Sequence, residues 1–381
     1  MAEHVVPEHL LTSSKKILFV AHLTTSTFTY LQNYFVAFEQ AYPHLAIDLW
    51  IEEPEQTYCF WRWNSIKKNI LFDWLRACPF INKLYTETYS PFVVKKSIKQ
   101  AQLEQYDIIV SLASRQIYSS IKRAQAINAQ AFIVAQKKNY KPYRHLFERA
   151  LLKKINGTYS YTPATQDHIS DVYAAWFKQL FGVDVPKKQR KPFVVIPRSW
   201  LLYAKLQFLK WEISKKRNIF TRVVLINACA KNNKQSWPLK NVFELIQTIK
   251  QRDQWNDITF LINTTPKELR TVKKMAYRYA LTQTHIISAD LNFFQLPAFI
   301  SISDLVISVE TSVMHLAGAL DIPTIALMRA NNTLRRPCKT TNTIIVEGVR
   351  KDAPISSIDC ANVIKATLEH SQLQTSLYRS E

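Results

Sequence analysis

Glycine is scarce in this sequence. Only four glycines occur among 381 residues, at Gly157, Gly182, Gly318 and Gly348. Their spacing forms neither a Gly-x-Gly-x-x-Gly fingerprint nor a P-loop, both of which use glycine to bring the backbone close to phosphate. The sequence therefore argues against a kinase, a P-loop nucleotidase or an ordinary dinucleotide-dependent dehydrogenase. If a nucleotide binds here, its phosphates must be held in another way.

Cysteines and long apolar runs are scarce as well. The five cysteines lie far apart and form no Cys-x-x-Cys pair, which is typical of reduced cytosolic thiols rather than a disulfide framework or a zinc site. No stretch reaches the roughly 18 apolar residues of a membrane-spanning helix. Residues 1–16 also lack the basic and then apolar order of a secretory signal. We therefore expect a cytoplasmic protein.

Acidic residues are few compared with basic ones. The chain has 50 Lys and Arg against 29 Asp and Glu, which leaves a formal charge of +21. This balance favours a polyanionic partner, which could be nucleic acid, an anionic membrane surface or a phosphorylated substrate. Because the sequence carries no helix-turn-helix, zinc or RNP-like signature, we expect no nucleic-acid partner.

The basic residues are concentrated between residues 186 and 222. This segment holds eleven Lys or Arg and one acid, Glu212. Its middle, residues 200–213, interleaves aromatic and aliphatic residues with lysines, a pattern that can lie in a membrane interface. The alternative is an ordinary helix packed against a domain, with its lysines reaching water. We expect peripheral contact with the anionic inner face of the cytoplasmic membrane through Lys205, Lys210, Lys215, Lys216 and Arg217.

Strand and helix patterns alternate in both halves of the chain. Short apolar runs predict strands at residues 16–21, 46–51, 106–112, 222–227, 258–263, 285–288, 304–309 and 324–328. Helical patterns between them are typical of doubly wound, parallel α/β sheets. The length suits two domains. We place these at residues 1–185 and 222–360, with a basic linker at 186–221 and a C-terminal helix or tail at 361–381.

The most informative segment is residues 296–328. Its first strand ends at Glu310, and Thr311 or Ser312 can cap the helix that follows. A helix start at the carboxyl end of a parallel strand aims N–H groups and a dipole at the ligand crevice, so a diphosphate can bind there without glycines. Glu310 is placed to accept hydrogen bonds from sugar hydroxyls. His315 could face the phosphates or be a core or capping histidine.

This segment resembles the C-terminal signature of the family-nine glycosyltransferases, the lipopolysaccharide heptosyltransferases. In that family a strand ends in Asp-Thr-Gly and continues into His-Leu-Ala-Ala-Ala-Leu and a Pro-Thr-x-Ala-Leu strand. The matching residues here are Glu310, Thr311, Ser312, His315, Leu316, Ala317, Gly318, Ala319, Leu320, Pro323, Thr324, Ala326 and Leu327. The resemblance implies a donor-binding role for Glu310, Thr311, Ser312, Val313 and His315.

A second stretch resembles the same family, whose members have a strand ending in Asn-Pro-Gly-Ala, a lysine-containing loop and Trp-Pro at a helix start. The matching residues are Asn227, Ala228, Cys229, Ala230, Lys234, Trp237 and Pro238. Ala228 and Cys229 replace the Pro-Gly pair, and Lys234 lies one residue further from the tryptophan than usual. The match implies that Asn227, Ala228 and Lys234 contact the donor, with Lys234 against its phosphate.

The N-terminal half matches the family in outline. His22 stands at the family's arginine position after the first strand, and Phe28 stands where the family has the aspartate that is its presumed general base. His22 is therefore our candidate base, and a structural histidine at a strand end is the alternative. Thr24, Thr25 and Ser26 form the turn expected to meet the acceptor.

The resemblance implies a GT-B architecture, with two Rossmann-like domains facing a central cleft. Residues 1–185 would bind the acceptor and residues 222–360 the nucleotide sugar. It also implies an inverting, metal-independent transfer without a cofactor, from ADP-heptose to a Kdo-lipid A or heptosyl core acceptor of lipopolysaccharide. The sequence has no Asp-x-Asp motif for a metal diphosphate. The alternative is a catalytically reduced GT-B shell that binds an anionic glycolipid or a partner protein.

Overall fold

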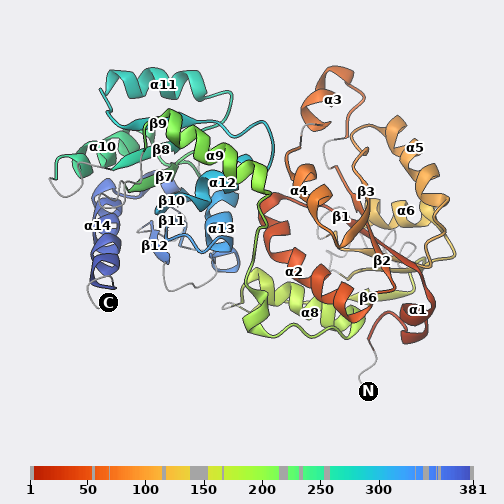
Figure 1. Ribbon diagram of the computed structural model, residues 1–381. Helices are drawn as coiled ribbons and strands as arrows, with labels where there is room; N and C mark the ends of the chain where they lie inside the picture. Colours follow the sequence, from red (N-terminus) through yellow and green to blue (C-terminus); the bar gives the residue numbers. More distant parts are fainter. Residues whose placement is uncertain are drawn as a thin grey trace. The chain divides into compact units, whose positions relative to one another are not determined.

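The computed structural model (Figure 1) describes residues 4–53, 56–67, 69–113, 117–137, 153–164, 167–213, 222–230, 235–252, 258–330, 332–337, 343–348, 350 and 353–377. The chain divides into two compact units, residues 1–191 (unit 1) and residues 192–381 (unit 2). The basic segment contributes a 3-10 helix, Lys187–Arg190, to unit 1 and the helix α9, Arg198–Lys210, to unit 2. The predicted residues Lys215, Lys216, Arg217 and Lys234 lie outside the described residues.

Unit 1 is built on a parallel sheet with the strand order β3-β2-β1-β4-β5-β6. The strands are β1 (Lys16–Ala21), β2 (Ala46–Ile51), β3 (Ile81–Tyr85), β4 (Ile108–Ser111), β5 (Phe132–Gln136) and β6 (Gly157–Tyr159). The helices are α1 (Glu8–Ser13), α2 (Thr25–Ala41), α3 (Phe60–Lys67), α4 (Leu71–Ala77), α5 (Pro91–Gln102), α6 (Ile117–Ile127) and α8 (Ile169–Phe181). The winding of the chain reverses between β1 and β4.

The pleat of β1 divides the core of unit 1 into two halves. Leu18 and Val20 pack with side chains of α5 and α6. Phe19 points to the opposite face, where its ring contacts four phenylalanines of α2 and α8: Phe35, Phe38, Phe177 and Phe181. Because successive side chains of a strand point to opposite faces, an apolar run such as that of β1 belongs in a sheet covered on both sides.

Unit 2 repeats this plan with the strand order β12-β11-β10-β7-β8-β9. The strands are β7 (Val223–Asn227), β8 (Thr259–Asn263), β9 (Thr284–Ile287), β10 (Leu305–Val309), β11 (Thr324–Met328) and β12 (Thr343–Glu347). The helices after α9 are α10 (Leu239–Lys250), α11 (Leu269–Arg278), α12 (Gln295–Ser301), α13 (Ser312–Ala319) and α14 (Cys360–Leu377). Here the winding reverses between β7 and β10.

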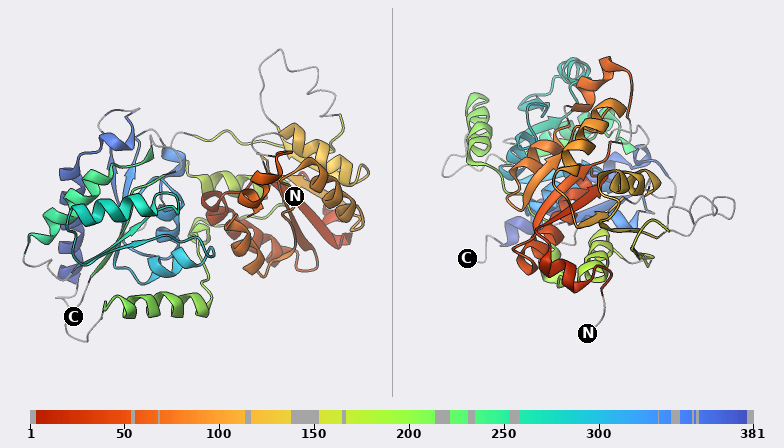
Figure 2. Two further views of the ribbon diagram at one scale, coloured as in Figure 1. Left: turned by 90° about the horizontal axis from the view of Figure 1, so that it is seen from above. Right: turned by 90° about the vertical axis from the view of Figure 1, so that its right-hand side faces the viewer.

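Helices cover both faces of the unit 2 sheet (Figure 2). Side chains of α10, α11 and α14 form one continuous core with alternate residues of the strands. On the other face α13 packs on β10 and β11, and α12 lies between α13 and α9. Trp237, which precedes α10, is 1% exposed, and its indole N–H donates to the carbonyl of Ile358 at 3.0 Å. This tryptophan of the Trp-Pro motif therefore supports the core.

Both units are thus doubly wound, parallel α/β sheets, and the predicted class is confirmed. Within the residues that the structure describes, no helix has the length and hydrophobicity needed to cross a bilayer.

Phe28 fills the position where the related family carries an aspartate. Its side chain in the first turn of α2 is fully buried, and its ring meets that of Trp74 edge-on, with 4.8 Å between centroids and 83° between planes. The position is therefore part of the aromatic core of unit 1.

We expect Phe28→Ala to lower the free energy of unfolding by about 3–5 kcal/mol, because it removes a buried ring and leaves a cavity. Phe28→Asp should cost more, since a carboxylate would then be buried among aromatic rings. Thermal or urea unfolding of purified variants measures both. Phe60→Ala is the matched control, because that ring is 69% exposed. A Phe28→Asp protein as stable as the wild type would show that the site accepts an acid.

Candidate active site

The candidate site residues lie at the two points where the winding reverses. In an open doubly wound sheet, ligands bind outside the carboxyl ends of the strands at such a point. In unit 2, Asn227 ends β7 and Glu310 follows β10, its neighbour in the sheet. In unit 1, His22 follows β1, beside β4. The topology thus brings the predicted donor residues together in unit 2, and it gives unit 1 a corresponding site.

Asn227 ties the strand tips of unit 2 together. Its amide nitrogen donates to Thr311 Oγ1 at 3.0 Å and to Ser308 Oγ at 3.3 Å, and its carbonyl oxygen accepts from the amide of Asn263 at 2.8 Å. Asn227 is only 3% exposed. Because both amide hydrogens serve protein hydroxyls, Asn227 acts here chiefly by positioning Thr311.

Thr311 begins the helix that the sequence predicted as the phosphate site. It is the N-cap of α13, and its hydroxyl accepts from the N–H of Val313 at 3.4 Å. Ser312 is half-buried and Val313 is buried. The positive end of the α13 dipole therefore lies where the winding reverses, and a helix start in this position can hold an anion without a glycine-rich loop.

Glu310 forms a fork with Arg329, which directly follows β11. Arg329 Nη2 donates to Oε1 at 3.0 Å and Nε donates to Oε2 at 3.2 Å, and Asn332 also donates to Oε1. This hydrogen-bonded carboxylate raises the pKa of Arg329 above its ordinary value. The Glu310 side chain is 5% exposed and that of Arg329 is 38% exposed. The guanidinium is therefore the more accessible group, and Glu310 orients it while keeping lone pairs for a sugar hydroxyl.

Sequence reasoning missed Arg329 and Asn332. The signal was present, because Arg329 comes directly after a predicted strand, at the edge of the sheet where Glu310 lies. His315, by contrast, is buried within α13, at 5% exposure. Its setting favours the alternative of a core histidine.

The loop after β7 is fixed at both ends. Ala228 is buried, and its carbonyl accepts from the N–H of Trp237 at 2.9 Å. The Ser236 hydroxyl accepts from the N–H of Ala230 at 2.9 Å. Burial, with a smaller contribution from Glu268, raises the pKa of the Cys229 thiol to about 11. Cys229 is therefore a neutral thiol near pH 7, filling space where the family has glycine.

His22 makes one informative hydrogen bond in unit 1. Its Nδ1 lies 3.1 Å from the carbonyl oxygen of Glu52, just after β2. A carbonyl only accepts, so Nδ1 must carry the proton, and in the neutral ring Nε2 is left with the lone pair that a general base needs. Thr24 caps α2 in a reciprocal capping box with Thr27, and Thr25 and Ser26 form the first turn. The predicted acceptor turn is thus a well-capped helix start.

Sequence reasoning missed Glu52, whose backbone carbonyl contacts His22 and whose side chain is a carboxylate. The Glu52 side chain is 8% exposed and pairs with Arg123 Nε at 3.2 Å. The Arg123 guanidinium in turn lies 5.5 Å from the ring centroid of Trp50. Unit 1 therefore has a second acid/base candidate at the edge of the sheet where β1 and β2 end.

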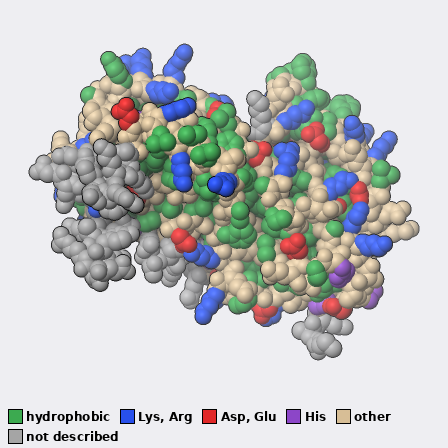
Figure 3. Space-filling view, in the orientation of Figure 1, with side chains coloured by type: hydrophobic (Ala, Val, Ile, Leu, Met, Phe, Trp, Pro, Cys, Tyr) green, Lys and Arg blue, Asp and Glu red, His purple; other side chains and the backbone are tan. Residues whose placement is uncertain are grey.

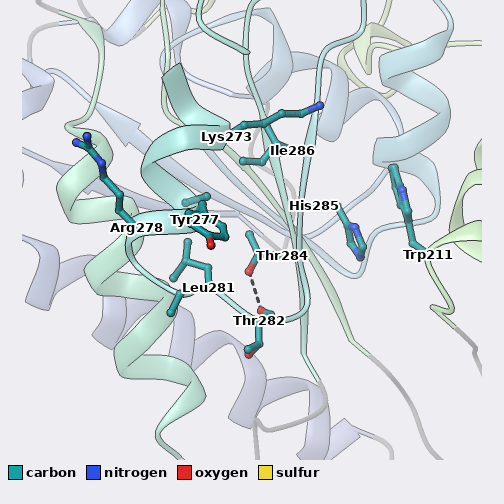
Figure 4. A pocket seen from close by; sticks show the side chains of 11 residues that line it. Trp211, Lys273, Tyr277, Arg278, Leu281, Thr282, Thr284, His285 and Ile286 are labelled. Atoms are coloured by element: carbon teal, nitrogen blue, oxygen red, sulfur yellow. Dashed lines mark hydrogen bonds between the residues drawn. The ribbon is translucent and has the colours of Figure 1, made fainter. Parts of the chain in front are cut away.

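Unit 2 also has a hollow away from these strand ends. A cavity of about 880 Å³ is bounded by α11, the segment before β9 and Trp211 (Figure 4). Trp211 stacks on His285 with 4.7 Å between ring centroids, and burial, together with the charge of Lys250, lowers the pKa of His285. The hollow opens at the amino end of β9, away from the strand ends that carry Asn227 and Glu310, so we do not assign the reaction to it.

Among the described residues, no three His, Cys, Asp or Glu side chains lie close enough together to ligate a metal ion.

The chain is similar to known glycosyltransferases in sequence. The model of glycosyltransferase family 9 (heptosyltransferase) matches residues 94–363, which is more than half of the chain. The lipopolysaccharide core heptosyltransferase OpsX of Haemophilus influenzae is 28% identical over 168 residues, a match that spans 44% of this chain and 44% of that protein.

Solved structures of the family share the fold. The glycosyltransferase family 9 protein of Veillonella parvula has a TM-score of 0.70 at 16% identity, covering 93% of this chain and 97% of its own. E. coli ADP-heptose lipopolysaccharide heptosyltransferase II has a TM-score of 0.66 at 14% identity, covering 94% and 99%. E. coli heptosyltransferase WaaC with ADP has a TM-score of 0.62 at 14% identity, covering 93% and 99%. These likenesses confirm the predicted GT-B fold.

The sequence resemblance is confirmed as well, because the matched range includes both signature segments, at the ends of β7 and β10. The chain therefore belongs to glycosyltransferase family 9, the heptosyltransferase family.

Proposed function

We propose that this chain transfers a heptose from ADP-heptose to the inner core of lipopolysaccharide, with Kdo-lipid A or a heptosyl core as the acceptor. The observation that carries the proposal is the linked group of Asn227, Thr311, Glu310 and Arg329 at the strand ends of unit 2. It lies in a family with a lipopolysaccharide core heptosyltransferase and an ADP-bound heptosyltransferase among its members. Turnover of ADP-heptose with a Kdo-lipid A acceptor tests it directly.

The proposed reaction is a single in-line displacement at the anomeric carbon, with inversion. The leaving diphosphate gains negative charge as the bond to the sugar breaks. The start of α13 and the Arg329 guanidinium are positive groups held in place before the reaction, so they can stabilise that charge without reorganising. Lys234 would add a third positive group. These protein groups support a metal-independent transfer without a cofactor.

The acceptor hydroxyl must lose its proton as it attacks. His22, with Nε2 as the basic atom, is our proposed general base, and the Thr24–Ser26 turn beside it would meet the acceptor. Glu52 is the competing candidate, because its carboxylate is held by Arg123 on the residue that directly follows β2. A general base contributes typically 10²–10⁴-fold to the rate.

One observation favours the second candidate function, a catalytically reduced shell that binds an anionic glycolipid or a partner protein. The family's aspartate position is filled by Phe28, a residue of the core. Retention of the donor segment from Glu310 to His315 counts against this reading. Absence of turnover, combined with binding of the glycolipid, would favour the shell.

We also propose that the protein acts peripherally on the cytoplasmic membrane, through α9. Phe208 of this helix is buried and packs against Phe299 of α12. The opposite side exposes three leucines: Leu202 at 55%, Leu206 at 47% and Leu209 at 67%. Lys205 and Lys210 are exposed on either side of this stripe. An exposed apolar stripe flanked by lysines suits an anionic membrane interface.

Removing the Glu310–Arg329 fork should reduce turnover. We expect Glu310→Ala and Arg329→Ala each to lower kcat roughly 100-fold, because each leaves the other group misoriented. The double variant should lose little more than either single one, since the two residues act as a unit. Steady-state assays of ADP release measure this. Arg190→Ala, which breaks the Arg190–Asp171 pair of unit 1, is the control. Wild-type turnover in Glu310→Ala would contradict the assignment.

Replacing the proposed base should change the pH profile. A histidine base works only when neutral, so turnover should fall as the solution is acidified and the ring becomes protonated. His22→Ala should lower turnover roughly 100- to 10,000-fold, and the acidic limb should disappear, with donor affinity unchanged. His44→Ala is the matched control, because Nε2 of His44 also pairs with a carbonyl, that of Leu11 at 2.9 Å. Should Glu52→Gln abolish turnover while His22→Ala keeps most of it, Glu52 is the base.

Neutralising the basic residues from Lys205 to Arg217, two of which lie on α9, should weaken membrane attachment. We expect replacement of Lys205, Lys210, Lys215, Lys216 and Arg217 by Gln to reduce binding to anionic vesicles by about 1 kcal/mol per residue. Turnover with a lipid-free acceptor should change little. Vesicle sedimentation measures the binding, with Lys273 and Lys274, exposed on α11, replaced as the control. Unaltered binding would rule out this stretch as the membrane face.

A further inference from the structure

Unit 1 exposes four large aromatic side chains around α3. They are Tyr58 at 69%, Phe60 at 69%, Trp61 at 68% and Phe92 at 66% exposure. The rings meet edge-on in two pairs, Tyr58 with Phe92 at 5.7 Å and Phe60 with Trp61 at 5.1 Å between centroids. We call these four residues the aromatic patch. Contiguous exposed apolar surface of this kind marks an interaction site more often than a random feature of a soluble surface.

The backbone beneath the aromatic patch is held by specific contacts. The N–H of Thr57 donates to the carbonyl of Tyr89 at 3.0 Å. Trp63 of α3 donates from its indole to the carbonyl of Thr57 at 3.0 Å, and its ring lies 5.5 Å from that of Tyr89. The segment before α3 is thus bonded to the segment before α5. The exposed rings therefore project from a backbone that these hydrogen bonds and ring contacts hold in place.

Positive charge surrounds the aromatic patch. Helices α3 and α5 contain no acidic residue and carry five basic ones: Arg62, Lys67, Lys95, Lys96 and Lys99. Lys95 and Lys96 lie one helical turn after Phe92, so they share its side of α5. Figure 3 shows the hydrophobic side chains gathered where Figure 1 draws α3, with Lys and Arg side chains nearby. The surface therefore combines exposed aromatic rings with cations.

The aromatic patch lies at the same edge of the sheet as the proposed acceptor site. It is built on the segments that follow β2 and β3. Glu52, the first residue after β2, accepts from His22 through its carbonyl and donates from its N–H to the carbonyl of Ala21. A surface that binds the aromatic patch would thus be brought to the edge of unit 1 where His22 lies.

We propose that the aromatic patch docks unit 1 on the surface of an anionic phospholipid bilayer. Tyrosine and tryptophan rings favour the headgroup region, where one end is apolar and the other wet, and the surrounding cations attract lipid phosphates. The tip of α3 projects from the unit (Figure 1). A projecting tip with rings on it can enter a deformable lipid surface, whereas a protein partner would need a matching acidic groove. The proposal rests on the proposed function only in that a lipid-linked acceptor gives the docking its purpose.

The test compares the variant Tyr58→Ser, Phe60→Ser, Trp61→Ser, Phe92→Ser with the wild type on phosphatidylglycerol-containing vesicles. We expect binding by flotation to fall at least about tenfold. The matched control replaces four exposed apolar residues elsewhere, Leu103, Val195, Tyr277 and Leu291, which are 83%, 74%, 88% and 68% exposed. This control should bind like the wild type. Equal binding of the wild type and the aromatic-patch variant would overturn the proposal.

Two further measurements keep the result interpretable. Lipids brominated near the headgroup should quench wild-type tryptophan fluorescence, and this quenching should be smaller in Trp61→Phe, which leaves the fold intact because Trp61 is exposed. Some quenching can remain because α9 carries Trp200. Quenching in Trp61→Phe equal to that of the wild type would show that the aromatic patch does not enter the bilayer. Turnover of ADP-heptose with a lipid-free acceptor should be equal in all these variants. If the wild-type protein binds vesicles but does not turn over ADP-heptose, the proposed function is wrong and the docking proposal still holds.

A third variant, Leu202→Ser, Leu206→Ser, Leu209→Ser, separates this surface from α9. Two membrane contacts predict partial loss of vesicle binding in each variant and near-complete loss when both sets are combined. If the α9 variant alone abolishes binding and the aromatic-patch variant has no effect, α9 is the membrane face and the inference is wrong.

Discussion

The strand ends of unit 2 depend on the hydrogen bond from the Asn227 amide to the Thr311 hydroxyl. This bond joins the ends of β7 and β10, from which the chain winds away in opposite directions. It therefore spans the point where the topology forms a crevice at the edge of the sheet. It also fixes the residue that caps α13, and thereby the direction of the helix start. Loss of Asn227 would remove one hydrogen bond each from Thr311, Ser308 and Asn263, at about 1 kcal/mol for each bond lost. Glu310 directly precedes Thr311 in the sequence, and its carboxylate is held by Arg329.

The scarcity of glycine explains why this helix start matters. A glycine-rich loop binds phosphate by bringing backbone N–H groups close to it, and such a loop cannot be built from the four glycines available. In the proposed donor site the N–H groups and the positive dipole would come from α13, and the point charge would come from Arg329, which Glu310 orients. Cys229 and Ala228 fill the positions of the family's Pro-Gly pair because the loop is instead fixed by its bond to Trp237. In this proposal the phosphate is bound by groups that side-chain contacts hold in place, and a glycine-rich loop is not needed.

The sequence predicted the central strands and the family to which the chain belongs. Strands such as β1, β7 and β10 are continuous apolar runs, because they are covered on both faces. The prediction missed β3, β5, β6 and β12. In β3, Asn82 and Lys83 interrupt the apolar pattern, and β6 is only three residues long, Gly157–Tyr159. It proposed Glu310 as a donor-binding residue but did not name its partner, Arg329. The fork depends on β10 and β11 being neighbours in register, and the position of Arg329 directly after a predicted strand was the only local sign of it.

In unit 1, the proposed acceptor-binding unit, a buried Phe28 in contact with Trp74 occupies the position where the related family has an aspartate. The base that we propose therefore comes from the strand ends instead. Both candidate bases, His22 and the Glu52 side chain, depend on the position of Glu52 directly after β2. The Glu52 carbonyl decides which nitrogen of His22 carries the proton, and the Glu52 side chain is neutralised by Arg123. The Glu52 carboxylate already accepts from Arg123, whereas Nε2 of a neutral His22 ring keeps a lone pair. For this reason we propose His22 rather than Glu52 as the group that removes the acceptor proton.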